Sequence, residues 1–138
     1  MSPKVMVVDD DPQILAGVRS LLEPWGVCLA TLDEPRQFWQ QLEDFAPDLL
    51  LLDIQMPHFN GLELCQVVRN SPKWQHLPIL FLTMHLDTVM MQQAIAAGAN
   101  DYVNKSIEGQ ALVQRTLKHL HQTRFWCPLN LSLCPIYE

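Results

Sequence analysis

Residues 49–53 read Leu-Leu-Leu-Leu-Asp, an uninterrupted apolar run that ends in a carboxylate. Residues 5–8 and 79–82 form two further runs of the same kind. Short continuous runs, unlike alternating ones, are typical of strands that are covered on both faces, as in a parallel sheet. Residues 27–31 and 101–103 are weaker strand candidates. The sequence therefore predicts a sheet of five strands.

Segments that follow these runs carry apolar residues at helical spacing, and we expect the apolar stripes to face the core. Asp11 is a candidate N-cap for the first helix, Pro12 suits its first turn, and Gly98 is expected to end the fourth helix. The stripes are Ile14, Val18, Leu21 and Leu22; Phe38, Leu42 and Phe45; Leu62, Leu64, Cys65 and Val68; Val89, Met90, Ala94 and Ala97; and Leu112, Val113, Leu117 and Leu120.

Strand and helix alternate five times, and right-handed crossovers fold such a chain into a doubly wound sheet. We therefore predict a flavodoxin-like (βα)5 α/β fold with the strand order 2-1-3-4-5. One domain is expected over residues 1–122. Residues 123–138 are expected to form an apolar C-terminal tail or part of an interdomain linker, in which two prolines disfavour a helix. A docking segment for another chain is the alternative.

Composition excludes several classes of protein. The 138 residues include 15 acidic and 9 basic ones, which gives a net charge of −6 and argues against a nucleic-acid or anionic-membrane surface. No apolar run is long enough to span a membrane. The four cysteines lack the paired spacing of zinc sites and disulfide frameworks. We therefore expect a cytoplasmic protein that contacts neither membranes nor nucleic acid through this segment.

Polar residues follow four of the five predicted strands, at the edge where open α/β sheets bind ligands. Each of them alone would be an ordinary cap or surface charge, but strands 1, 3, 4 and 5 are neighbours in the proposed order. Their carboxyl ends should therefore converge. The converging residues are Asp9, Asp10 and Asp11, then Asp53, Thr83 and Lys105.

Such a cluster of carboxylates is expected to hold a cation. Two unit charges about 5 Å apart repel by roughly 3 kcal/mol at an effective dielectric constant near 20. Oxygen ligands suit Mg²⁺ or Mn²⁺ rather than zinc. A metal, the Lys105 ammonium and the Thr83 hydroxyl around one carboxylate would form a receptor for a phosphoryl group, and the carboxylate itself can act as the nucleophile.

These residues lie in segments that resemble the receiver domain of bacterial two-component response regulators. The resemblance covers most of the chain from residue 4 to about residue 121. The segments are Val7-Val8-Asp9-Asp10-Asp11-Pro12; Leu51-Leu52-Asp53-Ile54-Gln55-Met56-Pro57 followed by Gly61; Thr83 at a strand end; and Ala97-Gly98-Ala99-Asn100-Asp101-Tyr102 leading to Lys105.

The resemblance implies that Asp53 accepts a phosphoryl group from a sensor histidine kinase or a phosphotransfer protein. Asp10 would ligate Mg²⁺ directly, Asp9 largely through water, and Gln55 through its backbone carbonyl. The expected metal set is therefore Asp9, Asp10, Asp53 and Gln55.

Two further side chains would bind the phosphoryl oxygens, Thr83 through its hydroxyl and Lys105 through its ammonium. Tyr102 stands where the family has a switch aromatic, and a half-buried strand tyrosine is the other interpretation. Phosphorylation would alter the face that residues 89–97, 101–103 and 112–120 form, and so change binding to a downstream effector protein or domain.

The resemblance makes the chain a signalling switch with slow self-dephosphorylation rather than an enzyme. Homodimers through the last helix and its neighbours are common in the family, so a second copy is another expected partner. Ser106 stands where most members have a proline that follows a cis peptide bond, and we expect a trans bond here. His85 and Gln55 occupy positions that tune the access of water.

Three other functions share part of this sequence pattern. A degenerate receiver that acts only as a protein-interaction module would keep the fold and leave the acidic pocket unused. A flavin carrier would share the fold, but the carboxylates of Asp9 to Asp11 would repel the phosphate of FMN. A phosphatase of the haloacid dehalogenase type needs a second aspartate at the position of Gln55.

Overall fold

The computed structural model describes residues 2–84, 87–105 and 109–124. Its main sheet is parallel and has five strands in the order β2-β1-β3-β6-β7. Counted along the chain, this is the predicted order 2-1-3-4-5. The strands are β1 (Lys4–Val8), β2 (Cys28–Leu32), β3 (Leu49–Asp53), β6 (Ile79–Thr83) and β7 (Asp101–Asn104).

Helices connect the strands, as the apolar spacing predicted. Asp11 caps α1 by accepting a hydrogen bond from the N–H of Gln13, and Gly98 ends α4 with a φ of 104°. The α-helices among the described residues are α1 (Pro12–Leu22), α2 (Phe38–Phe45), α3 (Gly61–Arg69), α4 (Thr88–Ala97) and α5 (Gly109–Arg124). Two short 3-10 helices, η1 (Glu23–Trp25) and η2 (Pro35–Gln37), precede β2 and α2.

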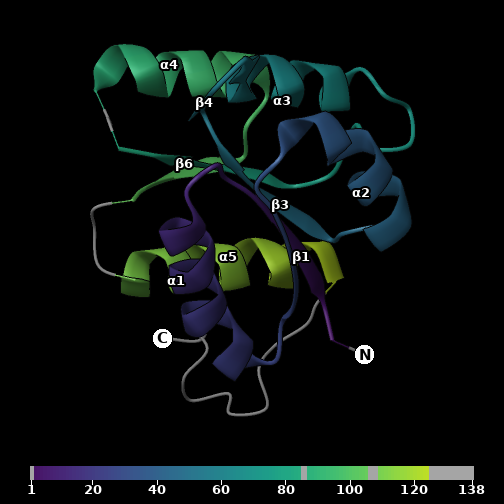
Figure 1. The fold of residues 1–138 in the computed structure, drawn as a ribbon, viewed down its shortest axis with the longest axis vertical. Coiled ribbons are helices and arrows are strands. Elements are labelled where there is room, and N and C mark those ends of the chain that lie inside the picture. Colours follow the sequence, from purple (N-terminus) through teal and green to yellow (C-terminus); the bar gives the residue numbers. More distant parts are fainter. Residues whose placement is uncertain (1, 85–86, 106–108, 125–138) are drawn as a thin grey trace.

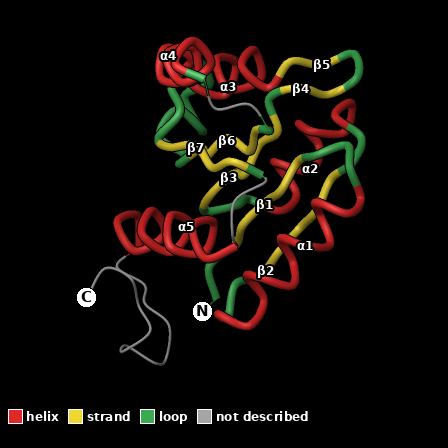
Figure 2. Tube along the Cα trace, turned by 90° about the vertical axis from the view of Figure 1, so that its left-hand side faces the viewer, coloured by secondary structure: helices red, strands yellow, loops and turns green. Residues whose placement is uncertain are grey.

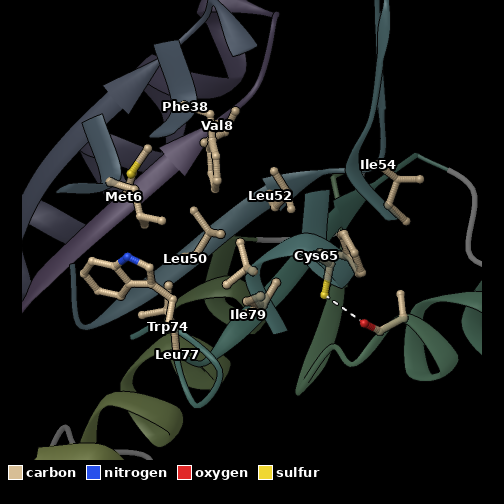
Figure 3. Packing of buried hydrophobic residues seen from close by; sticks show 14 of the residues in the cluster. Met6, Val8, Phe38, Leu50, Leu52, Ile54, Cys65, Trp74, Leu77 and Ile79 are labelled. Carbon is tan, nitrogen blue, oxygen red and sulfur yellow. Dashed lines mark hydrogen bonds between the residues drawn. The ribbon is translucent and has the colours of Figure 1, made fainter. Parts of the chain in front are cut away.

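The sheet lies between two layers of helices (Figures 1 and 2). Side chains of α2, α3 and α4 pack against one face, and those of α1 and α5 pack against the other. Alternate strand residues serve the two cores, since Met6 and Val8 belong to the first and Val5 and Val7 to the second. Figure 3 shows the first of these cores. Continuous apolar runs are needed because both faces of each central strand are covered.

Two features differ from the sequence-based expectation. Val89 was expected to face the core, but 62% of it is exposed because α4 buries only the side that carries Ala94 and Ala97. A small antiparallel hairpin also follows β3, formed by β4 (Gln55–Met56) and β5 (Phe59–Asn60). Its strands have two residues each, too few to produce a periodic signal.

Arg69, at the end of α3, forms hydrogen bonds that connect the segments before β6 and β7, at the amino ends of these strands. Its guanidinium donates to the carbonyls of Gly98 and Leu77 at 2.8 and 2.6 Å and to the side chain of Asn100 at 2.7 Å. The Asn100 side chain also accepts from the N–H of Ile79. The thiol of Cys65 donates to the carbonyl of Ala97 (Figure 3). Together these bonds hold the C-terminal end of α4.

Three expectations concern residues outside the described part of the chain. They are the role of the apolar tail from residue 125 onward, the peptide isomer before Ser106, and the influence of His85. No helix within residues 2–84, 87–105 and 109–124 combines the length and apolar character that crossing a membrane requires.

Two glycines provide a matched test of this packing. An alanine at Gly98 would need a left-handed backbone, and its Cβ would lie 2.8 Å from Cγ of Arg69. Gly17, inside α1, has no neighbour within 4 Å of such a Cβ. We expect Gly98→Ala to lower the free energy of unfolding by about 1–3 kcal/mol and Gly17→Ala to raise it by about 0.5–1 kcal/mol. Urea unfolding followed by circular dichroism measures both, and equal effects would contradict this packing.

Candidate functional site

Four strands of the sheet bring polar residues to one point at their carboxyl ends. Asp53 is the last residue of β3 and Thr83 the last of β6, while Asp9 and Lys105 follow β1 and β7 directly. The register pairs Thr83 with Asn104, and the N–H of Lys105 donates to the carbonyl of Thr83 at 2.8 Å. The convergence that the sequence predicted is therefore present.

Lys105 is the positive centre of this cluster. Its Nζ lies 2.7 Å from Oδ2 of Asp9 and 3.0 Å from Oδ1 of Asp53. Only 8% of the lysine side chain is exposed, and the exposed fractions of the Asp9 and Asp53 side chains are 0% and 5%. Ion pairs that are shielded from water in this way are screened much less than surface pairs. The ammonium therefore compensates for part of the negative charge at the site.

The three carboxylates differ in their surroundings. Asp9 is completely buried, and its Oδ1 accepts a hydrogen bond from the N–H of Asp11 at 3.0 Å. Asp53 is 3% exposed, whereas Asp10 is exposed to solvent. Asp9, Asp10 and Asp53 each offer an oxygen, and these oxygens lie within 4.8 Å of one another. Of these three carboxylates, Asp10 is therefore the one that is exposed to solvent.

A hollow of about 210 Å³ opens onto this cluster. Asp53 lines this hollow, so a solute can reach its carboxylate there. The hollow accommodates a small hydrated group but no extended cofactor. Its lining residues are Asp10, Asp11, Asp53, Gln55, Thr83, Met84 and Lys105.

Burial and neighbouring charges shift two pKa values at the site. Burial raises the pKa of Asp53 to about 6, the charge of Asp9 acts in the same direction, and Lys105 opposes both. Burial disfavours the charged form of Lys105, but its contacts with Asp9 and Asp53 outweigh burial and raise the pKa of the ammonium. The structure therefore favours charged Lys105 while it holds Asp53 as a weaker acid than usual.

The donors at the hollow fit a small divalent cation. The ligand atoms that Asp9, Asp10 and Asp53 offer are carboxylate oxygens, which Mg²⁺ and Mn²⁺ prefer. Gln55, the first residue of β4, also lines the hollow. Asp10, Asp53 and the carbonyl of Gln55 are the groups that could hold the ion on the open side.

Tyr102 is part of β7, opposite Phe81, and packs partly buried against the core of α2, α3 and α4, which agrees with the interpretation of a half-buried strand tyrosine. Its role as a switch aromatic stays a prediction. Tyr102 does not line the hollow. Met84 does line it, and 54% of this side chain is exposed. Sequence reasoning missed Met84 because an apolar residue carries no catalytic signal, although its position directly after Thr83 could have indicated it.

Comparisons with known proteins agree on one family. The family model of the response regulator receiver domain matches residues 5–117. Protein RcaC of Microchaete diplosiphon is 46% identical over 89% of this chain, and the DNA-binding response regulator MtrA of Mycolicibacterium smegmatis is 33% identical over 88%. Among solved structures, the chemotaxis protein CheY4 of Vibrio cholerae superposes with a TM-score of 0.79 at 27% identity, covering 87% of this chain and 99% of CheY4.

The matches differ in how much of each relative they cover. The chain spans 19% of RcaC and 52% of MtrA, so both relatives are much longer than the matched region. CheY4, in contrast, is matched over almost its whole length.

The raised pKa of Asp53 predicts a specific pH dependence of stability. Between about pH 4 and pH 6 the folded protein binds more protons at this residue than the unfolded chain does, so its contribution to stability falls as the pH rises through this range. Asp53→Asn lacks this titration. After allowance for the lost contact with Lys105, we expect the variant to be more stable than the wild type by about 1–2 kcal/mol at pH 7 and about equal below pH 4.

Urea unfolding of both proteins at several pH values, in the presence of a chelator, measures this difference. Taking the difference between the two proteins cancels the titration of the groups that do not interact with Asp53. A stability difference that is the same at pH 4 and pH 7 would show that Asp53 is not the titrating residue.

Proposed function

The chain belongs to the response regulator receiver domain family of two-component signalling, and we propose that it is a phosphorylation-dependent switch in which Asp53 accepts the phosphoryl group. The donor would be the phosphohistidine of a sensor histidine kinase or of a phosphotransfer protein. A carboxylate oxygen of Asp53 attacks phosphorus, the P–N bond breaks, and its electron pair returns to the imidazole nitrogen of the donor.

The observation that carries this proposal is the contact between Lys105 and Asp53 at the base of the hollow. A buried carboxylate with an ammonium 3.0 Å away is placed to receive a group whose charge is spread over three oxygens. The Lys105 ammonium would exchange its carboxylate oxygen for a phosphoryl oxygen. Thr83, at the end of the neighbouring strand, would donate its hydroxyl to a second one.

We propose that Asp10, Asp53 and the backbone carbonyl of Gln55 hold Mg²⁺ or Mn²⁺, with Asp9 acting through water. When bound, the cation offsets the negative charge that accumulates between the carboxylates and the incoming group. Asp10 is suited to this role because it is exposed and lines the hollow, so it can bind an ion that arrives from solvent.

The output would be a change of surface rather than a chemical product. When Thr83 turns toward the phosphoryl group, Tyr102 on the adjacent strand can move, and the face formed by α4, β7 and α5 repacks. Downstream effector proteins or domains, or a second copy of the chain, would bind this face. Slow hydrolysis of the aspartyl phosphate would return the switch to its first state.

Direct contact with nucleic acid is not part of this proposal. MtrA is named a DNA-binding response regulator, and the present chain matches about half of it. We assign the receiver role to this segment, a view that its net charge of −6 supports. A receiver that acts only through protein binding is the competing function, and phosphorylation of Asp53 distinguishes the two.

The first test is chemical. The purified chain is incubated with acetyl phosphate and Mg²⁺ and its intact mass is measured. We expect the mass of one phosphoryl group to be added to the wild type, to be absent in Asp53→Asn, and to be lost on treatment with hydroxylamine. Asp44→Asn, a substitution on the exposed surface of α2, is the matched control and should be phosphorylated normally. A wild type that gains no mass would favour the protein-binding function.

The second test concerns transmission of the signal. We expect Thr83→Ala to be phosphorylated at a rate within about fivefold of the wild type, because Asp53 and Lys105 are unchanged. The amide chemical-shift changes of α4 and Tyr102 on phosphorylation should be lost in this variant. Two-dimensional NMR of the wild type and the variant, each before and after phosphorylation, measures both. Full shift changes in Thr83→Ala would assign the coupling to another residue.

A further inference from the structure

Asp9 is the most enclosed carboxylate of the site, and both of its oxygens face donors. Its Oδ1 accepts from the N–H of Asp11 at 3.0 Å, and its Oδ2 lies 2.7 Å from Nζ of Lys105. None of the residue is exposed, and it is absent from the lining of the hollow. Asp10 has the opposite character, since it is exposed and lines the hollow. Two consecutive aspartates thus occupy different environments.

The shorter of the two contacts that Lys105 makes is the one to Asp9 rather than the one to Asp53. A lysine side chain has four rotatable carbon–carbon bonds and loses about 2 kcal/mol of conformational entropy when it is held. The N–H of Lys105 is bonded to Thr83, which places the backbone but not the ammonium. The direction of the ammonium is therefore set by whichever carboxylate stays in place.

Asp9 is the carboxylate that stays in place. Asp53 changes its charge and shape when it is modified, whereas Asp9 is fixed by the N–H of Asp11 and enclosed on all sides. An ion pair with a fully buried partner therefore restricts the lysine side chain in a way that its backbone hydrogen bond does not.

We propose that Asp9 is a positioning residue that acts through Lys105, while metal binding depends mainly on Asp10 and Asp53. The ammonium keeps its contact with Asp9 and pivots from an oxygen of Asp53 to an oxygen of the phosphoryl group. Asp9 thus contributes to phosphotransfer by holding the lysine within reach of Asp53. This inference rests on the proposed function, and it gives Asp9 a second role beside its water-mediated contact with the metal.

The test compares Asp9→Asn with Asp10→Asn. Asparagine at position 9 keeps an oxygen that can accept from the N–H of Asp11, and it removes the charge that faces Lys105. The affinity for Mn²⁺ is measured by the electron paramagnetic resonance signal of the free ion. The phosphorylation rate is measured with acetyl phosphate at saturating Mg²⁺, also in Lys105→Gln and in the double variant Asp9→Asn/Lys105→Gln.

We expect Asp9→Asn to raise the Mn²⁺ dissociation constant less than Asp10→Asn does, because position 9 contributes only a nearby charge whereas position 10 contributes a charge and a direct ligand. Asp10→Asn should raise the constant about 10- to 100-fold. Asp9→Asn should be phosphorylated at least about tenfold more slowly than the wild type. The double variant should be no slower than Lys105→Gln alone, because a residue that acts through the lysine has no effect once the lysine is gone.

A loss of Mn²⁺ affinity in Asp9→Asn as large as that in Asp10→Asn would overturn the proposal, and so would a double variant much slower than Lys105→Gln. A readout that does not need phosphorylation separates this inference from the proposed function. The NMR order parameter of the Lys105 Cε group should fall in Asp9→Asn and stay unchanged in Asp10→Asn. If the wild type is not phosphorylated, this measurement still decides whether Asp9 holds the lysine.

Discussion

Three carboxylates and one ammonium lie together at the carboxyl end of this sheet. The resulting excess of negative charge determines which groups the site can bind. Asp9 and Asp53 are buried, so water screens their repulsion only weakly, and Lys105 lies within 3.0 Å of both. One positive charge cannot neutralise Asp9, Asp10 and Asp53 together. A surplus of negative charge in a buried pocket favours any cation that fits. Burial is the main cause of the raised pKa of Asp53, and the charge of Asp9 adds to it.

This imbalance is a consequence of how the sheet is built. The central strands are covered by helices on both faces, so every position along them must be apolar. Polar residues can appear only where a strand leaves the core, and in a parallel sheet all strands leave at the same edge. The core and the site are therefore specified by the same runs: the last apolar residue of each strand sets the position of the functional group that follows it.

Much of the fold and the site could therefore be read from the sequence. The run at residues 49–53 and its two counterparts gave the central strands, and the residues that follow them proved to be the clustered ones. Such patterns do not predict other features of the structure. Arg69 binds carbonyls at three separate places, and an arginine at the end of a helix gives no sign of its distant partners. Val89 follows the helical period, but α4 carries apolar residues on several sides, so the period does not identify its buried side.

The same helix links the site to the surface of the molecule. Its C-terminal end is held by Cys65 and Arg69 through the carbonyls of Ala97 and Gly98, while its N-cap, Asp87, stands four residues after Thr83. In the proposed switch, a displacement that begins at Thr83 would act on a helix whose far end is held, and would turn the helix rather than slide it. Residues 88–97 contain no charged side chain, and Val89 and Ile95 are exposed. Such a turn would change how much apolar surface α4 exposes. A partner would then bind by burying this apolar surface rather than through charge.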